Sequence, residues 1–457
     1  MPMIKTKRWG KCTIIVICLI LAGGCMFNSG EGLYSLPQAP EGYLELQEQL
    51  DHVVKSGAEY TAPQSGMNTQ TVQLVDLDND GEGEAIACFR ESGKERPLKI
   101  YIFRAIEEGY ETAAVIEGEG TAINSIVYSD ITGDGWSEII VSWQMSAKVQ
   151  SMSVYSLKGY ELQQLMQTEY TKYAMADLDQ DGQMEIVTLH VDTGTLGSRA
   201  DYYFYKNGVL TLNDSVPLSY GIEEIEKVKT GRLYDGVPAV FVDSICGQNT
   251  VVTDILMVKN GVLSNVVLDE KTGVSNSTLR NYSVFCGDLD NDGYLEVPMP
   301  ERLPAAQASD GLDAAWIFHW NLYDSKGKTR RLMTTYHNYT DGWYLRLPPN
   351  WPGNKLIISR QDTTVGERTV VFSVQMKGPD DTVVDVPFLK IYKLTGANRK
   401  KRSELGERFL LRHDNSSSDT FYVAEFVNKE KTSTFQIEED VLINQFQLIQ
   451  SDWNLEA

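Results

Sequence analysis

The chain has 457 residues, with 41 basic and 63 acidic side chains and a net charge of −22. Such a chain lacks the basic patches that phosphate backbones require, so the composition argues against a nucleic-acid partner. Hydrophobic residues make up 42% of the sequence and aromatic residues 10%, enough for a large folded core. Two or three ordinary domains would fit this length, but repeat folds commonly use it for one continuous body.

The first 24 residues have the pattern of a bacterial export signal. Four basic side chains precede the apolar run 12–22, which is short for a membrane span but typical of a signal-peptide core. Residues 21–25, Leu-Ala-Gly-Gly-Cys, resemble a lipobox, although Ala22 departs from the usual leucine. The resemblance implies cleavage before Cys25 and a lipid on this cysteine; ordinary secretion and an uncleaved short anchor are the alternatives. Cleavage would take the net charge from −22 to −26, so the lipid, and not charge, is expected to hold the protein at the extracytoplasmic face of a bacterial membrane.

The rest of the chain divides into a tether and one folded body. Residues 25–40 are rich in Gly, Ser and Pro and are predicted to be a tether. Apolar residues recur at helical spacing from Tyr43 to about Lys55, which predicts one helix that ends before Gly57. After it come short β-type runs separated by turns. We therefore expect residues 41–457 to form an all-β body with one short N-terminal helix.

The dominant feature is an acidic nine-residue loop that recurs four times, beginning at Asp76, Asp130, Asp177 and Asp288. Oxygen-bearing side chains stand at positions 1, 3, 5 and 9, and glycine stands at position 6. This pattern suits calcium, because hard cations take several oxygen ligands and glycine permits the tight bend. An EF-hand begins in the same way but needs about 12 residues and a helix on each side. Here the last acid is at position 9 and the flanks are β-type.

The spacing of the loops predicts a repeating unit of about 50 residues. The first three loops begin 54 and 47 residues apart, and the gap of 111 residues before Asp288 leaves room for a copy that Asp235-Gly236 marks without the other acids. We call such a copy, which keeps the Asp-Gly pair but lacks the other acids, a worn copy. A second worn copy lies at Asp341-Gly342, and residues 390–448 have the length of one more unit. Each unit contains about four strands, which predicts a β-propeller with seven four-stranded blades; six or eight blades are the alternatives.

The loops resemble FG-GAP and VCBS repeats, the calcium-loop blades of integrin α-subunit propellers and of many bacterial surface proteins. The resemblance is clear over residues 70–345 and implies up to four structural calcium ions. The implied ligands are the side chains at positions 1, 3, 5 and 9: Asp76, Asp78, Asp80, Glu84; Asp130, Thr132, Asp134, Glu138; Asp177, Asp179, Asp181, Glu185; Asp288, Asp290, Asp292, Glu296. Position 9 is Glu where the family more often has Asp, so this side chain is expected to reach differently. Thr132 is neutral, so the second loop is expected to bind most weakly. Turns capped by aspartate without metal are the alternative.

The sequence contains no recognisable catalytic motif. The five histidines are scattered, and the metal loops already account for the clustered carboxylates. Aromatic clusters at 316–320 and 343–351 are candidate carbohydrate platforms, but we expect most of these rings in the core. The chain is thus predicted to be a monomeric, non-enzymatic module that binds a protein or a glycan. A propeller hydrolase or lyase that acts on cell-surface polysaccharide is the alternative.

Overall fold

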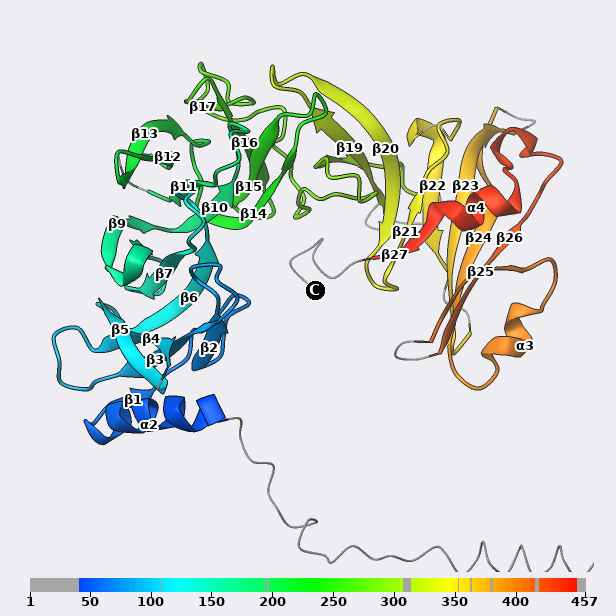
Figure 1. Cartoon of the computed structure of the whole chain (residues 1–457). Helices are drawn as coiled ribbons and strands as arrows, with labels where there is room; N and C mark the ends of the chain where they lie inside the picture. Colours follow the sequence, from blue (N-terminus) through cyan, green and yellow to red (C-terminus); the bar gives the residue numbers. More distant parts are fainter. Residues whose placement is uncertain are drawn as a thin grey trace, which may run out of the picture. The chain divides into compact units, whose positions relative to one another are not determined.

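The computed structural model describes most of the chain beyond residue 40 (Figure 1). The described residues are 41–107, 109–192, 194, 197–306, 314–351, 353–361, 364–378, 381–415 and 419–449. The predicted signal segment, the tether and Cys25 lie outside them and stay predictions. Within the described residues, no helix has both the length and the apolar character to cross a membrane.

These residues fall into two compact units. Among the described residues, one comprises 41–61, 71–75 and 82–117, and the other comprises 62–70, 76–81 and those from 118 onward. Together they contain six antiparallel sheets of four or five strands among the described residues, so the all-β prediction is confirmed.

The first unit consists of one sheet and the N-terminal helix. Helix α2 (Glu41–Lys55) has the predicted position, and its apolar stripe of Leu46, Leu50 and Val53 packs on Phe89 and Phe103 of the sheet. The sheet has the order β1-β3-β4-β5, with β2 also paired to β3. Its strands are β1 (Glu59–Tyr60), β2 (Val72–Val75), β3 (Glu84–Arg90), β4 (Leu98–Ile106) and β5 (Gly109–Gly118). The helix thus covers apolar surface of its own sheet.

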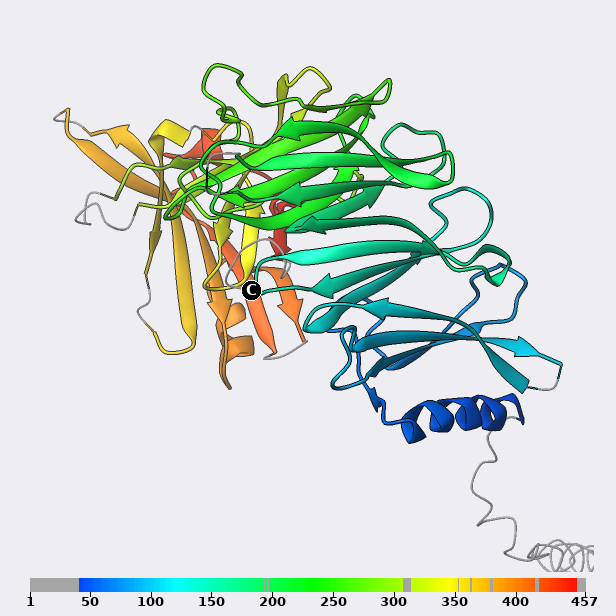
Figure 2. The same cartoon turned by 90° about the vertical axis from the view of Figure 1, so that its left-hand side faces the viewer.

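The second unit begins with three four-stranded sheets in which the strands pair in chain order. They are β6 (Ala122–Ser129), β7 (Glu138–Gln144), β8 (Gln150–Ser156) and β9 (Gln163–Tyr170); β10 (Lys172–Ala176), β11 (Glu185–His190), β12 (Arg199–Lys206) and β13 (Val209–Pro217); and β14 (Glu224–Arg232), β15 (Pro238–Ile245), β16 (Val251–Lys259) and β17 (Val262–Asn265). Figure 2 shows them in cyan to green as successive layers. Alternate residues of β11 face different neighbours: Ile186 packs with Met152 of the preceding sheet, and Val187 packs with Val242 of the following one. Burial on both faces explains why such strands read as continuous apolar runs.

The last two sheets depart from this repeat. The fifth has the order β18-β19-β20-β21-β27 and the sixth has the order β22-β23-β24-β26-β25. Their strands are β18 (Val297–Arg302), β19 (Trp316–Tyr323), β20 (Thr329–Asn338), β21 (Trp343–Arg346) and β27 (Phe446–Leu448); and β22 (Leu356–Arg360), β23 (Glu367–Lys377), β24 (Val383–Leu394), β25 (Phe409–Asp414) and β26 (Thr420–Phe426). The two sheets share one core, in which Ile317 and Tyr336 of the fifth pack with Ile358 and Phe372 of the sixth.

The structure differs from several predictions made from the sequence. Residues 390–448 do not form a separate unit, because β25 and β26 complete the sixth sheet and β27 pairs with β21. The prediction of seven four-stranded blades is therefore not confirmed. Asp341-Gly342 does not open a new sheet, since it turns the chain between β20 and β21. The prediction of a single short helix was incomplete: α3 (Arg399–Ser403) and α4 (Glu439–Gln445) follow, as do the 3₁₀ turns η1 (Lys158–Tyr160), η2 (Gly353–Lys355) and η3 (Ser433–Phe435).

A buried ion pair fixes the long connection between β17 and β18. The guanidinium of Arg280 donates to Asp243 Oδ1 at 2.9 Å, and both side chains are fully buried. Arg280 also donates to Thr253 Oγ1 at 2.9 Å and to the carbonyls of Thr278 and Val284. The Cys286 N–H donates to Asp243 Oδ2 at 2.8 Å. Because the charges are paired and hydrogen-bonded, the connection that leads into the fourth acidic loop is held against β15 and β16.

Breaking this pair should cost far more stability than removing it whole. Asp243→Ala leaves the Arg280 charge buried without its carboxylate, and we expect unfolding to become easier by about 3–5 kcal/mol. The double change Asp243→Leu with Arg280→Met removes both charges and should recover most of that loss. Urea denaturation followed by circular dichroism measures both effects. Equal destabilisation by the single and double variants would contradict this account.

Candidate metal loops and an aromatic pocket

The four acidic loops share one backbone conformation. Positions 4 and 6 both have positive φ: Asn79 60° and Gly81 94°; Gly133 71° and Gly135 88°; Gln180 65° and Gly182 93°; Asn291 59° and Gly293 84°. The first aspartate caps the turn, as in the third loop, where Asp177 accepts the N–H groups of Asp181 and Gly182 at 3.1 Å each. Asp288 accepts the corresponding pair in the fourth loop at 3.1 and 2.8 Å. Each turn is therefore stabilised by its own aspartate, as the metal-free alternative requires.

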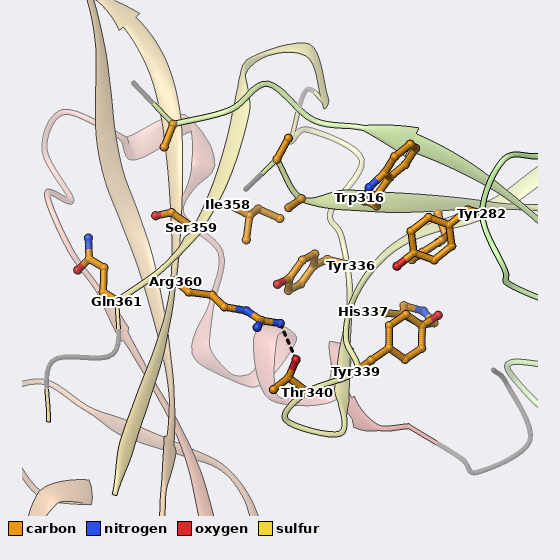
Figure 3. Close-up of a pocket in the computed structure, with 14 residues that line it drawn as sticks. Tyr282, Trp316, Tyr336, His337, Tyr339, Thr340, Ile358, Ser359, Arg360 and Gln361 are labelled. Carbon is orange, nitrogen blue, oxygen red and sulfur yellow. Dashed lines mark hydrogen bonds between the residues drawn. The ribbon is translucent and has the colours of Figure 1, made fainter. Parts of the chain in front are cut away.

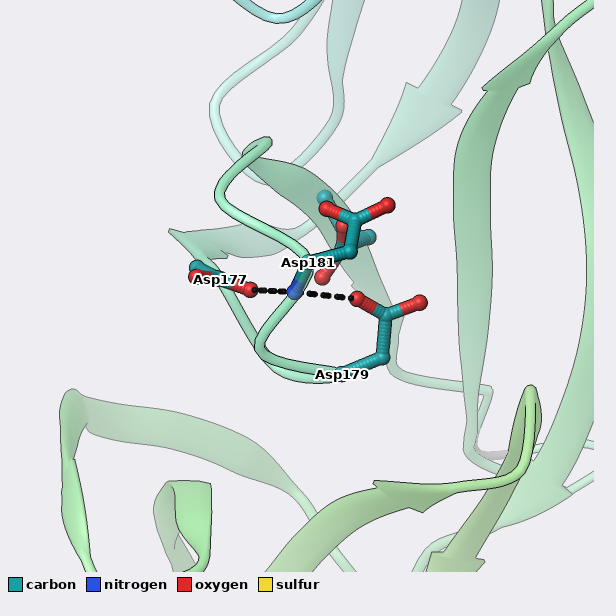
Figure 4. A group of neighbouring side chains, drawn as sticks. Asp177, Asp179 and Asp181 are labelled. Atoms are coloured by element: carbon teal, nitrogen blue, oxygen red, sulfur yellow. Dashed lines mark hydrogen bonds between the residues drawn. The ribbon is translucent and has the colours of Figure 1, made fainter.

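The third loop brings all four of its predicted ligands together. Asp177, Asp179, Asp181 and Glu185 each place one carboxylate oxygen within 4.8 Å of the others, and Figure 4 shows the three aspartates around the turn. Burial, followed by the neighbouring carboxylates, raises the pKa of Glu185 to about 7. Burial and the charge of Asp181 also raise the pKa of Asp179. Oxygen ligands that repel one another in this way are a typical setting for a divalent cation.

The fourth loop gathers three aspartates above a buried glutamate. Asp288, Asp290 and Asp292 form a group within 4.8 Å, and Glu296 is not part of it. Glu296 is fully buried, and its Oε2 accepts the Leu289 N–H at 2.9 Å. Its Oε1 is buried without a hydrogen-bond partner among the described residues. Burial raises the pKa of this carboxyl to about 8. A buried oxygen of this kind favours either a proton or a cation beside it.

The glutamate at position 9 has a structural role that the sequence did not predict. In Glu138 and Glu185, as in Glu296, one carboxylate oxygen accepts the backbone N–H of position 2. The N···O distances are 2.9 Å from Ile131 to Glu138 and 2.7 Å from Leu178 to Glu185. The side chain at position 2 is itself apolar and buried in each of these loops. A glutamate is long enough to reach under the turn in this way. Position 9 therefore anchors the loop to the core, whether or not it also binds metal.

The second loop is the one that departs most from the pattern. Lys158 Nζ lies 3.0 Å from Asp134 Oδ2, so an ammonium group faces one predicted ligand. Both N–H groups at Ile131 and Thr132 donate to Glu138 Oε2. No group of three carboxylates within 4.8 Å forms in this loop among the residues described. The sequence analysis did not identify Lys158, because it lies outside the loop in the turn after β8.

In the first loop, the carboxylate of Asp76 accepts the N–H groups of Asp80 and Gly81 at 3.2 and 3.0 Å. The Tyr160 hydroxyl donates to Asp78 Oδ2 at 2.9 Å. Glu84 is the first residue of β3 and is buried. The loop therefore has the same capped turn as the others, and its second aspartate already holds one protein donor.

In the two worn copies, protein groups form hydrogen bonds or ion pairs with the aspartate carboxylates. The carboxylate of Asp235 accepts the Ser325 N–H at 3.1 Å. Asp341 is buried and lies 2.9 Å from Arg368 Nη1 and 3.7 Å from Lys393 Nζ. At Asp341, side chains of the sixth sheet thus supply the positive charge that a cation would supply elsewhere.

A pocket of about 730 Å³ lies beside the fifth and sixth sheets (Figure 3). Aromatic rings and small polar side chains line it: Tyr282, Ala306, Ala314, Ala315, Trp316, Phe318, Tyr336, His337, Tyr339, Thr340, Ile358, Ser359, Arg360 and Gln361. Arg360 extends from β22 toward Thr340, while Trp316, Tyr282 and Tyr339 gather on the other side. The volume is in the range of roughly 300–1,000 Å³ that accommodates drug-sized ligands.

The aromatic clusters predicted from the sequence divide between this pocket and the core. Trp320, Trp343 and Trp351 are buried, with 0%, 1% and 5% of their surface exposed, as expected for core residues. Trp316 packs against the same cluster as Trp320, so both rings lie on one face of β19. Trp316 is only partly buried and reaches the pocket. The tertiary structure thus separates the partly exposed ring from the buried one.

Three polar side chains meet on neighbouring strands of the fifth sheet. His319 lies 2.5 Å from Glu301 Oε2 through Nε2 and 3.0 Å from Thr334 Oγ1 through Nδ1. A histidine between a carboxylate and a hydroxyl is the arrangement that general acid–base catalysis uses. The same contacts also form an ordinary cross-strand polar ladder. Sequence reasoning did not group these residues, because they are brought together only by the register of the strands.

His337 should make stability depend on pH. It is buried among Phe318, Trp320, Tyr339 and Tyr344, with ring centroids 5.0–5.8 Å away. This burial lowers the pKa of His337 to about 3, from an unfolded value of about 6.5. Between these values the unfolded chain takes up a proton that the native chain does not. The stability that the neutral His337 contributes to the native state is therefore complete above about pH 6.5. Below that value the free energy of unfolding falls by up to about 1.4 kcal/mol per pH unit.

Urea midpoints between pH 7 and pH 4.5 measure this dependence. His337→Phe should flatten the slope by nearly one proton, whereas His52→Phe on the exposed face of α2 should leave it unchanged. An unaltered slope in His337→Phe would rule out this residue as the source.

Comparison with known proteins identifies no family. No family description matches the sequence, and no curated protein matches it significantly. Two solved structures illustrate the weak structural likenesses. A Bacteroides fragilis protein described as a candidate 6-phosphogluconolactonase is 12% identical, with 68% of this chain and 81% of that chain covered and a TM-score of 0.24. Sqt1 of Saccharomyces cerevisiae is 11% identical, with 72% and 100% covered and a TM-score of 0.25. At these TM-scores the likenesses carry no weight for fold or function.

Proposed function

We propose that this chain is a propeller-like binding module with structural calcium loops, held by a lipid on Cys25 at the extracytoplasmic face of a bacterial membrane. The observation that carries the proposal is the recurrence of one loop geometry at the start of successive sheets. In the second and third sheets the loop joins the first two strands, and each sheet packs face to face on the next. Four-stranded units with this order are the usual components of propellers.

Two features of the loops support calcium over capping by aspartate alone. In the third loop four carboxylates approach within 4.8 Å of one another, which is costly without a positive charge. In the fourth loop, Glu296 Oε1 is buried and unsatisfied among the described residues. All the candidate donors are oxygens, which suits Ca²⁺ better than softer metals. The ions would stabilise the turns and would take no part in chemistry.

Calcium should raise the melting temperature of the mature protein. Binding to the native state alone stabilises by about 2.7 kcal/mol at a concentration of 100 Kd, so EDTA should lower the transition by several degrees. Asp181→Asn in the third loop should remove part of this response. Asp134→Asn, at the same position of the second loop, where Lys158 already pairs with the aspartate, should change it little. Differential scanning calorimetry with and without Ca²⁺ measures both. A transition that EDTA does not move would exclude structural calcium.

The partly exposed aromatic rings of the pocket support a binding role. Trp316 and Tyr282 lie with ring centroids 5.3 Å apart and remain only partly buried, although a deep core is available beside them. Exposed aromatic side chains that line a concave site are a common feature of ligand-binding surfaces. A protein or a glycan of the cell envelope is the proposed partner.

Immobilised mature protein should therefore retain material from cell-envelope fractions. We expect Trp316→Ala to reduce retention at least about tenfold, because a buried aromatic contact contributes one to several kcal/mol. Tyr220→Ala, at a ring that is 77% exposed and outside the pocket, is the matched control. Protease or periodate treatment of the fraction shows whether protein or glycan is retained. Equal retention by wild type and Trp316→Ala would contradict a binding role for this pocket.

Hydrolase or lyase activity on cell-surface polysaccharide is the second candidate, and the Glu301, His319 and Thr334 contacts are the observation that favours it. If His319 transfers a proton during catalysis, His319→Gln should lower turnover by about 10²-fold or more. The release of reducing or unsaturated sugar ends from purified polysaccharide measures turnover. The absence of any product from the wild-type protein would leave these residues as a polar ladder.

A further inference from the structure

We propose that the pocket beside the fifth and sixth sheets binds an acidic saccharide, with sugar rings on its aromatic wall and a sugar carboxylate on Arg360. This inference rests on the proposed binding function and names its ligand class. The two parts of the ligand site are the partly exposed rings and one preoriented guanidinium.

The aromatic wall has rings available for stacking. Tyr282 lies 5.3 Å from Trp316 at an interplanar angle of 54°, and 5.2 Å from Phe318 at 71°. Trp316, Tyr282 and Tyr339 are partly buried, in contrast to the fully buried Trp320 behind them. The C–H faces of sugar rings are apolar and pack on such rings, while the hydroxyls at their edges stay polar.

Arg360 presents a positive charge in a fixed position. It is exposed at the end of β22, and its Nη2 donates to Asn338 Oδ1 at 3.1 Å and to Thr340 Oγ1 at 3.0 Å. Both acceptors are neutral. Among the described residues no carboxylate lies within ion-pair distance of Arg360, whereas the neighbouring Arg368 pairs with Asp341. Because one edge of the guanidinium is already held, little entropy is lost when the other edge binds an anion.

The polar side chains of the pocket favour a saccharide over a purely apolar ligand. Ser359, Thr340 and Gln361 line the same cavity as the aromatic rings. An apolar ligand would desolvate these groups and Arg360 without offering hydrogen bonds, which is unfavourable. Sugar hydroxyls would pair with them. The described lining residues include no Asp or Glu, so the charge they present is that of Arg360. A volume of about 730 Å³ leaves room for more than one sugar ring.

The test uses three acidic trisaccharides as probes: α-1,4-trigalacturonate, β-1,4-triglucuronate and β-1,4-trimannuronate. Each is compared with its neutral counterpart, in which the carboxylates are replaced by hydroxymethyl groups. Titration calorimetry and tryptophan fluorescence of the full mature protein measure the affinities. We expect at least one acidic trisaccharide to bind, with an affinity at least about tenfold higher than its neutral counterpart, as a charge-assisted contact provides.

Variants assign the two parts of the site. Arg360→Gln should reduce the affinity for the acidic probe to that of the neutral one, while Arg330→Gln on the exposed end of β20 should leave both unchanged. Trp316→Ala should lower the affinities for the acidic and the neutral probe by the same factor. Equal binding of acidic and neutral probes, or an unaltered preference in Arg360→Gln, would overturn the proposal, as would the absence of binding by all three acidic probes. A peptide with a free carboxyl end that binds in place of them would also overturn it.

The experiments distinguish failure of the acidic-saccharide proposal from failure of the proposed binding function. Retention of envelope material that depends on Trp316, together with no binding of the acidic probes, would overturn the acidic saccharide and keep the binding function. Loss of both would overturn both. Melting curves of each variant in Ca²⁺ show that it is folded, so a loss of affinity cannot be assigned to unfolding.

Discussion

The regular part of the structure depends on a carboxylate buried beneath each acidic turn. In the second, third and fourth loops the glutamate at position 9 accepts the N–H of position 2, and the apolar side chain at position 2 is buried at the same point. A buried carboxylate is costly unless a proton, hydrogen bonds or a cation offset its charge. One backbone hydrogen bond offsets only part of that cost, as the raised pKa values of Glu185 and Glu296 indicate. The neighbouring aspartates add further negative charge, which contributes to the raised pKa values of Glu185 and Glu296.

One worn copy and the second acidic loop each place protein cations beside an aspartate. Asp341 has Arg368 and Lys393 beside it, and the sixth sheet provides both. Asp134 has Lys158, from the 3₁₀ turn that follows β8. In both cases a basic side chain lies beside the aspartate and offsets part of its negative charge. Protein ammonium and guanidinium groups therefore provide positive charge at these two aspartates.

Local patterns in the sequence predicted much of this architecture. The helix at 41–55, the four loops and the strands around them follow from helical spacing, alternation and Asp-Gly turns. The hairpins at Asn207 and Asn260 adopt the positive φ that their Asn-Gly pairs require. The short helices α3 and α4 were missed, and the other failures are long-range. The pairing of β27 with β21 joins segments about 100 residues apart, and no local signal specifies it. The pocket combines Tyr282, Trp316 and Arg360 from three separate stretches, so the sequence indicated its aromatic residues but not which of them would remain exposed.

The pocket lies where the repeat breaks down. The first four-stranded sheets of the second unit are joined by short turns, and both their faces are used in packing against neighbours. The fifth and sixth sheets instead have five strands each, the fifth includes β27 from the C-terminal segment, and a long connection leads into it from β17. Trp316 is partly exposed there, whereas Trp320 on the same strand is buried. A regular repeat buries most of its apolar side chains against its neighbours. Binding and catalytic sites in proteins commonly lie where the regular structure is interrupted. The second and third acidic loops thus lie within regular four-stranded sheets, whereas the pocket lies beside the two sheets that depart from the repeat.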